Sequence, residues 1–237
     1  THLGHSFPTR RSSDLSPSTA CHRLPLKLTS LELTGMGTTT CPQSMLRSIF
    51  ESSSSSISLL LFNFEGQLQS FSAPGAFPYL PLVSSTLRHL ALKAYPFPDI
   101  LLPELKAFES LISLTYDITY TGEESRAQSE ALAEALPLSL TRLIVIVTSR
   151  VRLSGLKASV KPIISNTRFV NLKLLEMVHP AGDWGEAFLA VAKDVLGPTC
   201  AARGIEFGDM RKEVLDGLRG DWVSLELSVR RLPSVSR

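Results

Sequence analysis

Two glycines stand where a phosphate-binding loop would need them. Gly35 and Gly37 follow a predicted strand and precede a predicted helix, and Thr40 takes the third place of the G-x-G-x-x-G spacing. Glu65 comes after the next predicted strand, where an acid would hold a ribose. One hypothesis is therefore a doubly wound α/β enzyme that binds a nucleotide on the Gly35–Gly37 loop. Because a lone G-x-G is a weak signal, we prefer the alternative, a flexible strand-to-helix turn.

Histidines and cysteines are the other residues that could carry chemistry. The histidines considered are dispersed: His22, His89 and His179. No cysteine or acid stands at ligand spacing from them, which argues against a metal site. The cysteines are Cys21, Cys41 and Cys200. They show no C-x-x-C spacing, and nothing indicates a base and an orienting group for Cys200 as a nucleophile. We predict no catalytic, cofactor-binding or metal-binding residues, and a chain that is not an enzyme.

Composition sets the class of protein. The chain has 237 residues, of which 43% are hydrophobic and 19% charged, as in ordinary globular domains that bury a sizeable core. A net charge of +2 gives no reason to expect a nucleic acid or a membrane as partner. The longest aliphatic run, residues 143–147, is far short of the about 18 residues of a membrane span. With no secretory signal, we expect an intracellular protein, cytoplasmic or nuclear, with reduced thiols.

One segment reads as an artefact. Residues 5–15, HSFPTRRSSDL, match the translation of a common short-read sequencing adapter. We therefore exclude residues 1–15 from fold reasoning and expect them to be disordered. The true gene is expected to extend further in the N-terminal direction. Residues 16–237 are expected to form a single domain.

A spacing of apolar residues recurs along the chain, at places that we number positions 1, 4 and 6. Its six clear copies are Leu28/Leu31/Leu33, Ile57/Leu60/Phe62, Leu87/Leu90/Leu92, Leu111/Leu114/Tyr116, Leu140/Leu143/Val145 and Leu172/Leu175/Met177. Two degenerate copies are Ala202/Ile205/Phe207 and Trp222/Leu225/Leu227. Up to position 202, successive copies begin 24 to 32 residues apart. A regular period of this length is typical of stacked structural repeats.

Each copy predicts a short strand whose positions 4 and 6 share one face, because side chains alternate along a strand. The spacing leaves room for the crossovers that parallel strands need, and it predicts a full helix in each unit. Helices are expected over residues 42–51, 123–136 and 183–195, the last with Trp184, Phe188, Leu189 and Ala192 on one face. Strand order separates the two hypotheses. Stacked repeats keep the order of the chain, whereas a doubly wound sheet reverses it.

The L-x-x-L-x-L blocks and their spacing resemble leucine-rich-repeat proteins, in the long-repeat style of the fungal F-box and leucine-rich-repeat group. The resemblance implies an α/β solenoid, a curved parallel sheet with outer helices, of about six to eight irregular repeats. None of the copies has the family's asparagine three residues after position 6. In that family the concave strand surface binds a protein partner. In F-box members it recognises the substrate of a ubiquitin ligase adaptor.

Strand positions 3, 5 and 7 are expected to form the concave face. The candidate partner-binding residues on it are Glu32, His89, Lys93, Asp117, Arg142 and Glu176. Its apolar members Leu59, Leu61, Ile144 and Ile146 could form an exposed interaction patch. Two alternatives stay open: a solvated face with scattered charges, and apolar residues that a missing segment would cover. We predict a monomer that binds a protein partner, with no cofactor.

Overall fold

The computed structural model describes residues 28–34, 43–63, 77–93, 102–118, 130–147, 153–179 and 182–211. Several predictions fall elsewhere. The adapter-like residues 1–15, the Gly35–Gly37 loop with Thr40, Glu65 and the copy that begins at Trp222 all lie outside these ranges.

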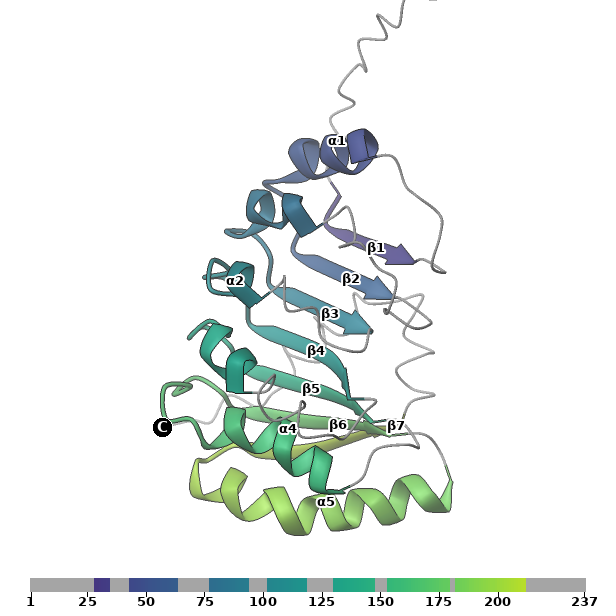
Figure 1. Cartoon of the computed structure of the whole chain (residues 1–237), viewed down its shortest axis with the longest axis vertical. Coiled ribbons are helices and arrows are strands. Elements are labelled where there is room, and N and C mark those ends of the chain that lie inside the picture. Colours follow the sequence, from purple (N-terminus) through teal and green to yellow (C-terminus); the bar gives the residue numbers. More distant parts are fainter. Residues whose placement is uncertain are drawn as a thin grey trace, which may run out of the picture.

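A single open sheet of seven parallel strands organises the molecule (Figure 1). The strands are β1 (Ser30–Thr34), β2 (Leu59–Asn63), β3 (His89–Lys93), β4 (Ser113–Ile118), β5 (Arg142–Val147), β6 (Leu174–His179) and β7 (Glu206–Arg211). They lie side by side in the order of the chain, β1 to β7. The α/β class and the sequential strand order are confirmed. The order never reverses among these strands, so they form no switch point of the kind at which doubly wound sheets bind nucleotides.

The strand register aligns the copies of the apolar pattern. Position 4 of each copy pairs with position 4 of the next in one row across the sheet: Leu31, Leu60, Leu90, Leu114, Leu143, Leu175 and Phe207. The seventh copy was therefore assigned wrongly, because Phe207 stands at position 4 and not at position 6. Asp209 takes position 6, opposite Met177. On the core face of β7, Phe207 is followed by Asp209 and not by a second apolar residue. The sequence alone therefore does not show which position of the pattern Phe207 occupies.

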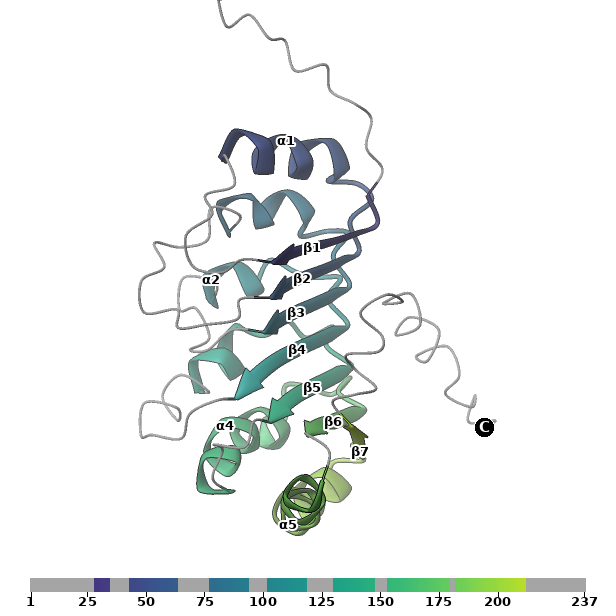
Figure 2. The same ribbon diagram turned by 90° about the vertical axis from the view of Figure 1, so that its right-hand side faces the viewer.

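The connections carry helices of unequal length. These are α1 (Gln43–Ser53), η2 (Phe77–Val83), α2 (Leu102–Leu105), a helical turn over residues 130–135, α4 (Leu153–Ser165) and α5 (Asp183–Ala202). The first five lie on one side of the sheet (Figure 2), and α5 packs against α4, β6 and β7 at its end. The helices expected at 42–51 and 183–195 are confirmed as α1 and α5, although α5 continues to Ala202. Helix α4 was not predicted.

In two units, the described part of the connection does not show the full helix that was expected. Between β2 and β3 the connection forms the 3₁₀ helix η2, which contains Pro81. Proline lacks the N–H that an α-helix interior requires, and short 3₁₀ segments tolerate it better. Between β3 and β4, the described residues 102–112 hold only the four-residue helix α2, in the unit with the shortest spacing. Proline content does not by itself set the amount of helix, because α4 and α5 contain Pro162 and Pro198.

The core lies between the sheet and these helices. It takes the side chains of positions 1, 4 and 6, together with one further large phenylalanine in three of the units: Phe50, Phe108 and Phe169. Helix α5 buries Leu189, Ala192, Leu196 and Cys200. Trp184 was expected on that buried face, but its side chain is 40% exposed and stacks on Phe188 with ring centroids 5.2 Å apart. The first turn of α5 reaches past the sheet, which leaves the indole partly in solvent.

A polar side chain stands just before position 1 of five units and bonds each unit to the preceding one. Ser56, Ser110 and Ser139 donate from Oγ to the carbonyls of Leu28, Ser85 and Leu111, at 2.8, 2.8 and 2.7 Å. Thr86 Oγ1 donates to Ser54 O at 3.0 Å and Asn171 Nδ2 to Leu138 O at 3.0 Å. We call these five residues the polar ladder. It joins the turns that enter the strands.

None of the helices within the described ranges is both long enough and apolar enough to cross a membrane.

Candidate partner-binding face

The second face of the sheet, defined as the side chains at strand positions 3, 5 and 7, points away from the main core. All six predicted site residues lie on it. Glu32 on β1 is exposed, His89 on β3 and Asp117 on β4 are half-buried, and Lys93 ends β3 with a side chain outside the described set. Arg142 on β5 is buried and Glu176 on β6 is half-buried. The sheet brings Arg142 and Glu176 together, but it keeps Glu32 four strands away from Arg142.

Arg142 and Glu176 form an ion pair across β5 and β6. Arg142 Nε donates to Glu176 Oε2 at 2.5 Å, and a terminal guanidinium nitrogen contacts the same oxygen. The side chains are only 8% and 13% exposed, so each charge depends on the other for its solvation. The pairing was not predicted. Their separation of 34 residues is one repeat of 32 plus two strand positions, which places them diagonally on neighbouring strands.

Gly208 on β7 makes room for the Glu176 side chain. It is the register partner of Glu176, and a Cβ atom at Gly208 would lie 3.1 Å from Glu176 Cγ and 3.6 Å from Leu174 Cδ1. That distance to Cγ is closer than ordinary van der Waals contact. The glycine thereby lets the carboxylate stay beside Arg142.

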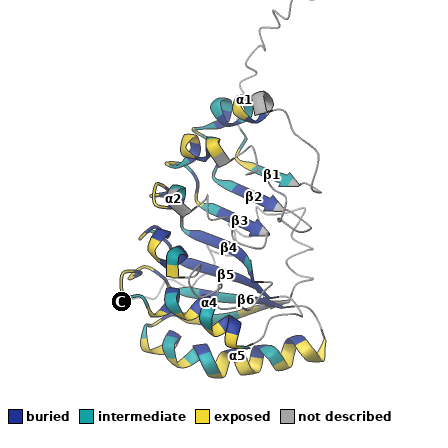
Figure 3. Ribbon diagram, viewed as in Figure 1, coloured by how far each residue is buried: buried dark blue, intermediate teal, exposed yellow. Residues whose placement is uncertain are grey.

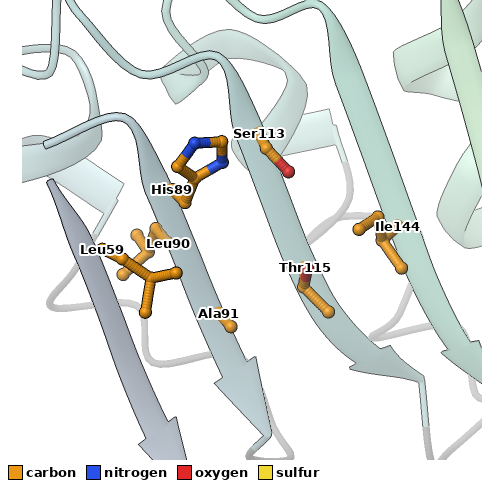
Figure 4. Close-up of a pocket in the computed structure, with 7 residues that line it drawn as sticks. All are labelled: Leu59, His89, Leu90, Ala91, Ser113, Thr115 and Ile144. Atoms are coloured by element: carbon orange, nitrogen blue, oxygen red, sulfur yellow. The ribbon is translucent and has the colours of Figure 1, made fainter. Parts of the chain in front are cut away.

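A small cavity opens on the second face between β2 and β5 (Figure 4). Its lining residues are Leu59, His89, Leu90, Ala91, Ser113, Thr115 and Ile144. His89 and Ser113 are register partners on neighbouring strands, and no carboxylate belongs to the lining. The volume is about 20 Å³, room for about one water molecule. Ligand pockets for small organic molecules usually exceed about 300 Å³, so this cavity fits none.

The centre of the second face is buried, which does not fit the hypothesis of an exposed apolar patch, one of the alternatives left open for this face. Leu61 and Ile144 are each 1% exposed and Val178 is 0% exposed, although none of the three belongs to the main core cluster. Ile146 is buried as well, and Leu59 is half-buried. The burial extends over the middle strands (Figure 3). Glu32 and Glu206, on the two outermost strands, are exposed.

The remaining reactive groups lie apart from this face. Burial raises the pKa of the Cys200 thiol in α5 to about 11, and Cys200 is a free cysteine. Burial also raises the pKa of Tyr116, whose hydroxyl donates to Ser159 O at 3.5 Å on the helix side. Within the described ranges, no three histidine, cysteine or acidic side chains gather closely enough to hold a metal ion.

The fold defines an α/β protein with one open parallel sheet in chain order. No family model, no curated protein and no solved structure matches this chain. The sheet and its second face are therefore the observations that bear on function.

Proposed function

We propose that the chain is a non-enzymatic interaction module of the leucine-rich-repeat kind, an irregular solenoid that binds a protein partner through the second face. One observation carries this proposal. Seven parallel strands follow chain order and their connecting helices lie on the other side, so the second face aligns side chains from seven successive units. Stacked repeats of this type characteristically use such extended strand surfaces for binding.

Two further observations support the repeat interpretation. Positions 4 and 6 of the first six copies meet in register along the sheet. The polar ladder also recurs at one place in five units, with partners 25 to 33 residues earlier in the chain. A contact that recurs once per unit is expected when each unit packs only on its neighbours. The finer proposal is that the partner is the substrate of an F-box-type ubiquitin ligase adaptor.

The exposed acids at the two ends of the second face give the sharpest test. A photo-crosslinking amino acid is placed at Glu32 on β1, at Glu206 on β7 and, as a control, at the exposed Lys157 on α4. We expect Glu32 and Glu206 to capture the same protein and Lys157 not to capture it. Glu32→Lys with Glu206→Lys should abolish binding of that purified protein, and Lys157→Glu should not. Capture of the same protein from Lys157 alone would contradict the second face as the binding surface.

Arg142 is avoided in this test because its charge is buried against Glu176. Reversing it would leave two acids together and disturb the fold as well as the surface. The ligase proposal has a separate readout: ubiquitylation of the captured protein in the presence of the full-length gene product. That readout should be lost in the Glu32→Lys, Glu206→Lys variant. Binding without ubiquitylation would retain the interaction module and reject the adaptor.

A further inference from the structure

The cavity on the second face comes from a run of small side chains on β3 and β4. In the row of strand position 5, alanine and threonine stand next to each other as Ala91 and Thr115. Their neighbours on β2 and β5 are the larger Leu61 and Ile144. In the row of position 3, Ser113 is smaller than both of its neighbours. Small side chains between larger ones leave a cavity, here of about 20 Å³.

Two of the residues that line this cavity are buried hydroxyl side chains on β4. Ser113 is 5% exposed and Thr115 is 3% exposed, and both line the cavity from the same side of the strand (Figure 4). Neither hydroxyl forms a hydrogen bond to another group in the described part of the chain. A buried hydroxyl without a partner costs stability, because it gives up its hydrogen bonds to bulk water. The space that both hydroxyls line is therefore where a shared partner would stand.

The cavity has the size of one water molecule, and its two hydroxyls stand at the right spacing to share that molecule. A buried water needs about 10–15 Å³ and two to four polar partners. Residues two apart on a strand lie about 6.6 Å from each other. Two hydrogen bonds of about 2.8 Å each can therefore bridge hydroxyls that lean toward each other by about 1 Å. Figure 4 shows the Ser113 oxygen directed along β4 toward Thr115.

We propose that this cavity binds one water molecule, which hydrogen-bonds to Ser113 Oγ and Thr115 Oγ1. No carboxylate is among the described residues of the lining, so they do not favour a metal cation over water. The two hydroxyls are then part of a water site and not contacts for a protein partner. The inference goes beyond the proposed function and does not depend on it, because it concerns only side chains within one chain.

Removing the two hydroxyls separately and together tests whether they share one water. Ser113→Ala and Thr115→Val should each lower the melting temperature by about 3 °C, because each leaves the other hydroxyl incompletely hydrogen-bonded. The double variant should lose no more than either single variant, since no hydroxyl then remains to be satisfied. As a control, the losses of Ser56→Ala and Ser139→Ala should add, because these hydroxyls bond to separate units. Additive losses at positions 113 and 115 would overturn the shared water.

Filling the cavity separates a bound water from an empty apolar space. Ala91→Val adds two methyl groups to the lining. In the wild-type background it should lower the melting temperature by about 3 °C or more, because it displaces the water from both hydroxyls. In the Ser113→Ala, Thr115→Val background the same change should cost less, since overpacking is common to both backgrounds and no hydroxyl is left to lose a partner. An Ala91→Val change that stabilises the wild type would contradict the bound water, because filling an empty apolar space is favourable.

Direct observation of the water in the unchanged protein keeps the proposal testable if the variants misfold. In a crystal structure at about 1.5 Å resolution, one density peak should lie within about 3 Å of both hydroxyl oxygens. The peak should be absent from the Ser113→Ala, Thr115→Val variant. A wild-type structure without this peak would overturn the proposal. So would a peak that bromide replaces in a crystal soaked in sodium bromide, because that result would show an anion site.

Discussion

At the scale of single residues, two glycines differ in what surrounds them: Gly208 packs against a side chain of the neighbouring strand, and Gly197 does not. A Cβ at Gly208 meets Glu176 Cγ at 3.1 Å, whereas one at Gly197 in α5 meets nothing within 4 Å. Gly208→Ala should lower the free energy of unfolding by about 1 kcal/mol, because Glu176 is pushed from Arg142. Gly197→Ala should change it little, because the helix preference of alanine is offset by the contact of its Cβ with the ring of Pro198. Urea denaturation measures both, and a stabilising Gly208→Ala would contradict the packing argument.

Cys200 gives a residue-scale prediction for pH. Its pKa is about 11 in the folded chain and about 8.5 in an unfolded one. The folded state holds the thiol proton more tightly than the unfolded state, which stabilises the fold. This stabilisation is complete below the unfolded-state pKa and is lost as the pH rises toward the folded-state pKa. The wild type should lose more stability than Cys200→Ala in that alkaline window. Thermal unfolding scans at increasing pH measure this difference. If the melting temperatures of the two proteins fell by the same amount, the thiol would not titrate as stated.

The polar ladder leads to a prediction at the scale of elements. Ser56→Ala and Ser139→Ala each remove a hydrogen bond between successive units, and each should cost about 1 kcal/mol. Ser165→Ala is the matched control, because that exposed hydroxyl bonds only to Lys161 O within its own helix. Its effect on the free energy of unfolding should be close to zero. Equal losses in all three variants would mean that the ladder does not join the units.

Elements also show what the sequence could predict. The L-x-x-L-x-L spacing predicted the parallel strands and the register of six copies, since burial fixes which side chains share a face. It failed at β7, where Asp209 stands at position 6 in place of an apolar residue. It also missed α4, and it missed the pairing of Arg142 with Glu176, which depends on the offset between neighbouring units. Strand periodicity places Leu61 and Ile144 on the face away from the core, so it did not predict that both are almost fully buried.

At the scale of the whole molecule, each of the seven described strands pairs only with its neighbours in chain order. Units stacked in one dimension gain stability from nearest neighbours, so interior units should open less often than terminal ones. All side chains of β5 are buried, whereas those described on β1 are exposed or half-buried. We therefore expect hydrogen exchange to be slowest at β5 amides and fastest at β1 amides.

Two leucines at position 4 of the pattern test whether interior strands are more stable than terminal ones. Leu143→Ala in β5 should cost about 3 kcal/mol and speed exchange over all strands, because the interior units depend on it. Leu31→Ala in β1 should cost less, because Leu31 is only half-buried, and should speed exchange mainly in β1 and β2. Mass-spectrometric hydrogen exchange on both variants resolves the two patterns. If Leu31→Ala accelerated β5 as much as β1, the sheet would unfold as one cooperative unit and the nearest-neighbour description would not apply.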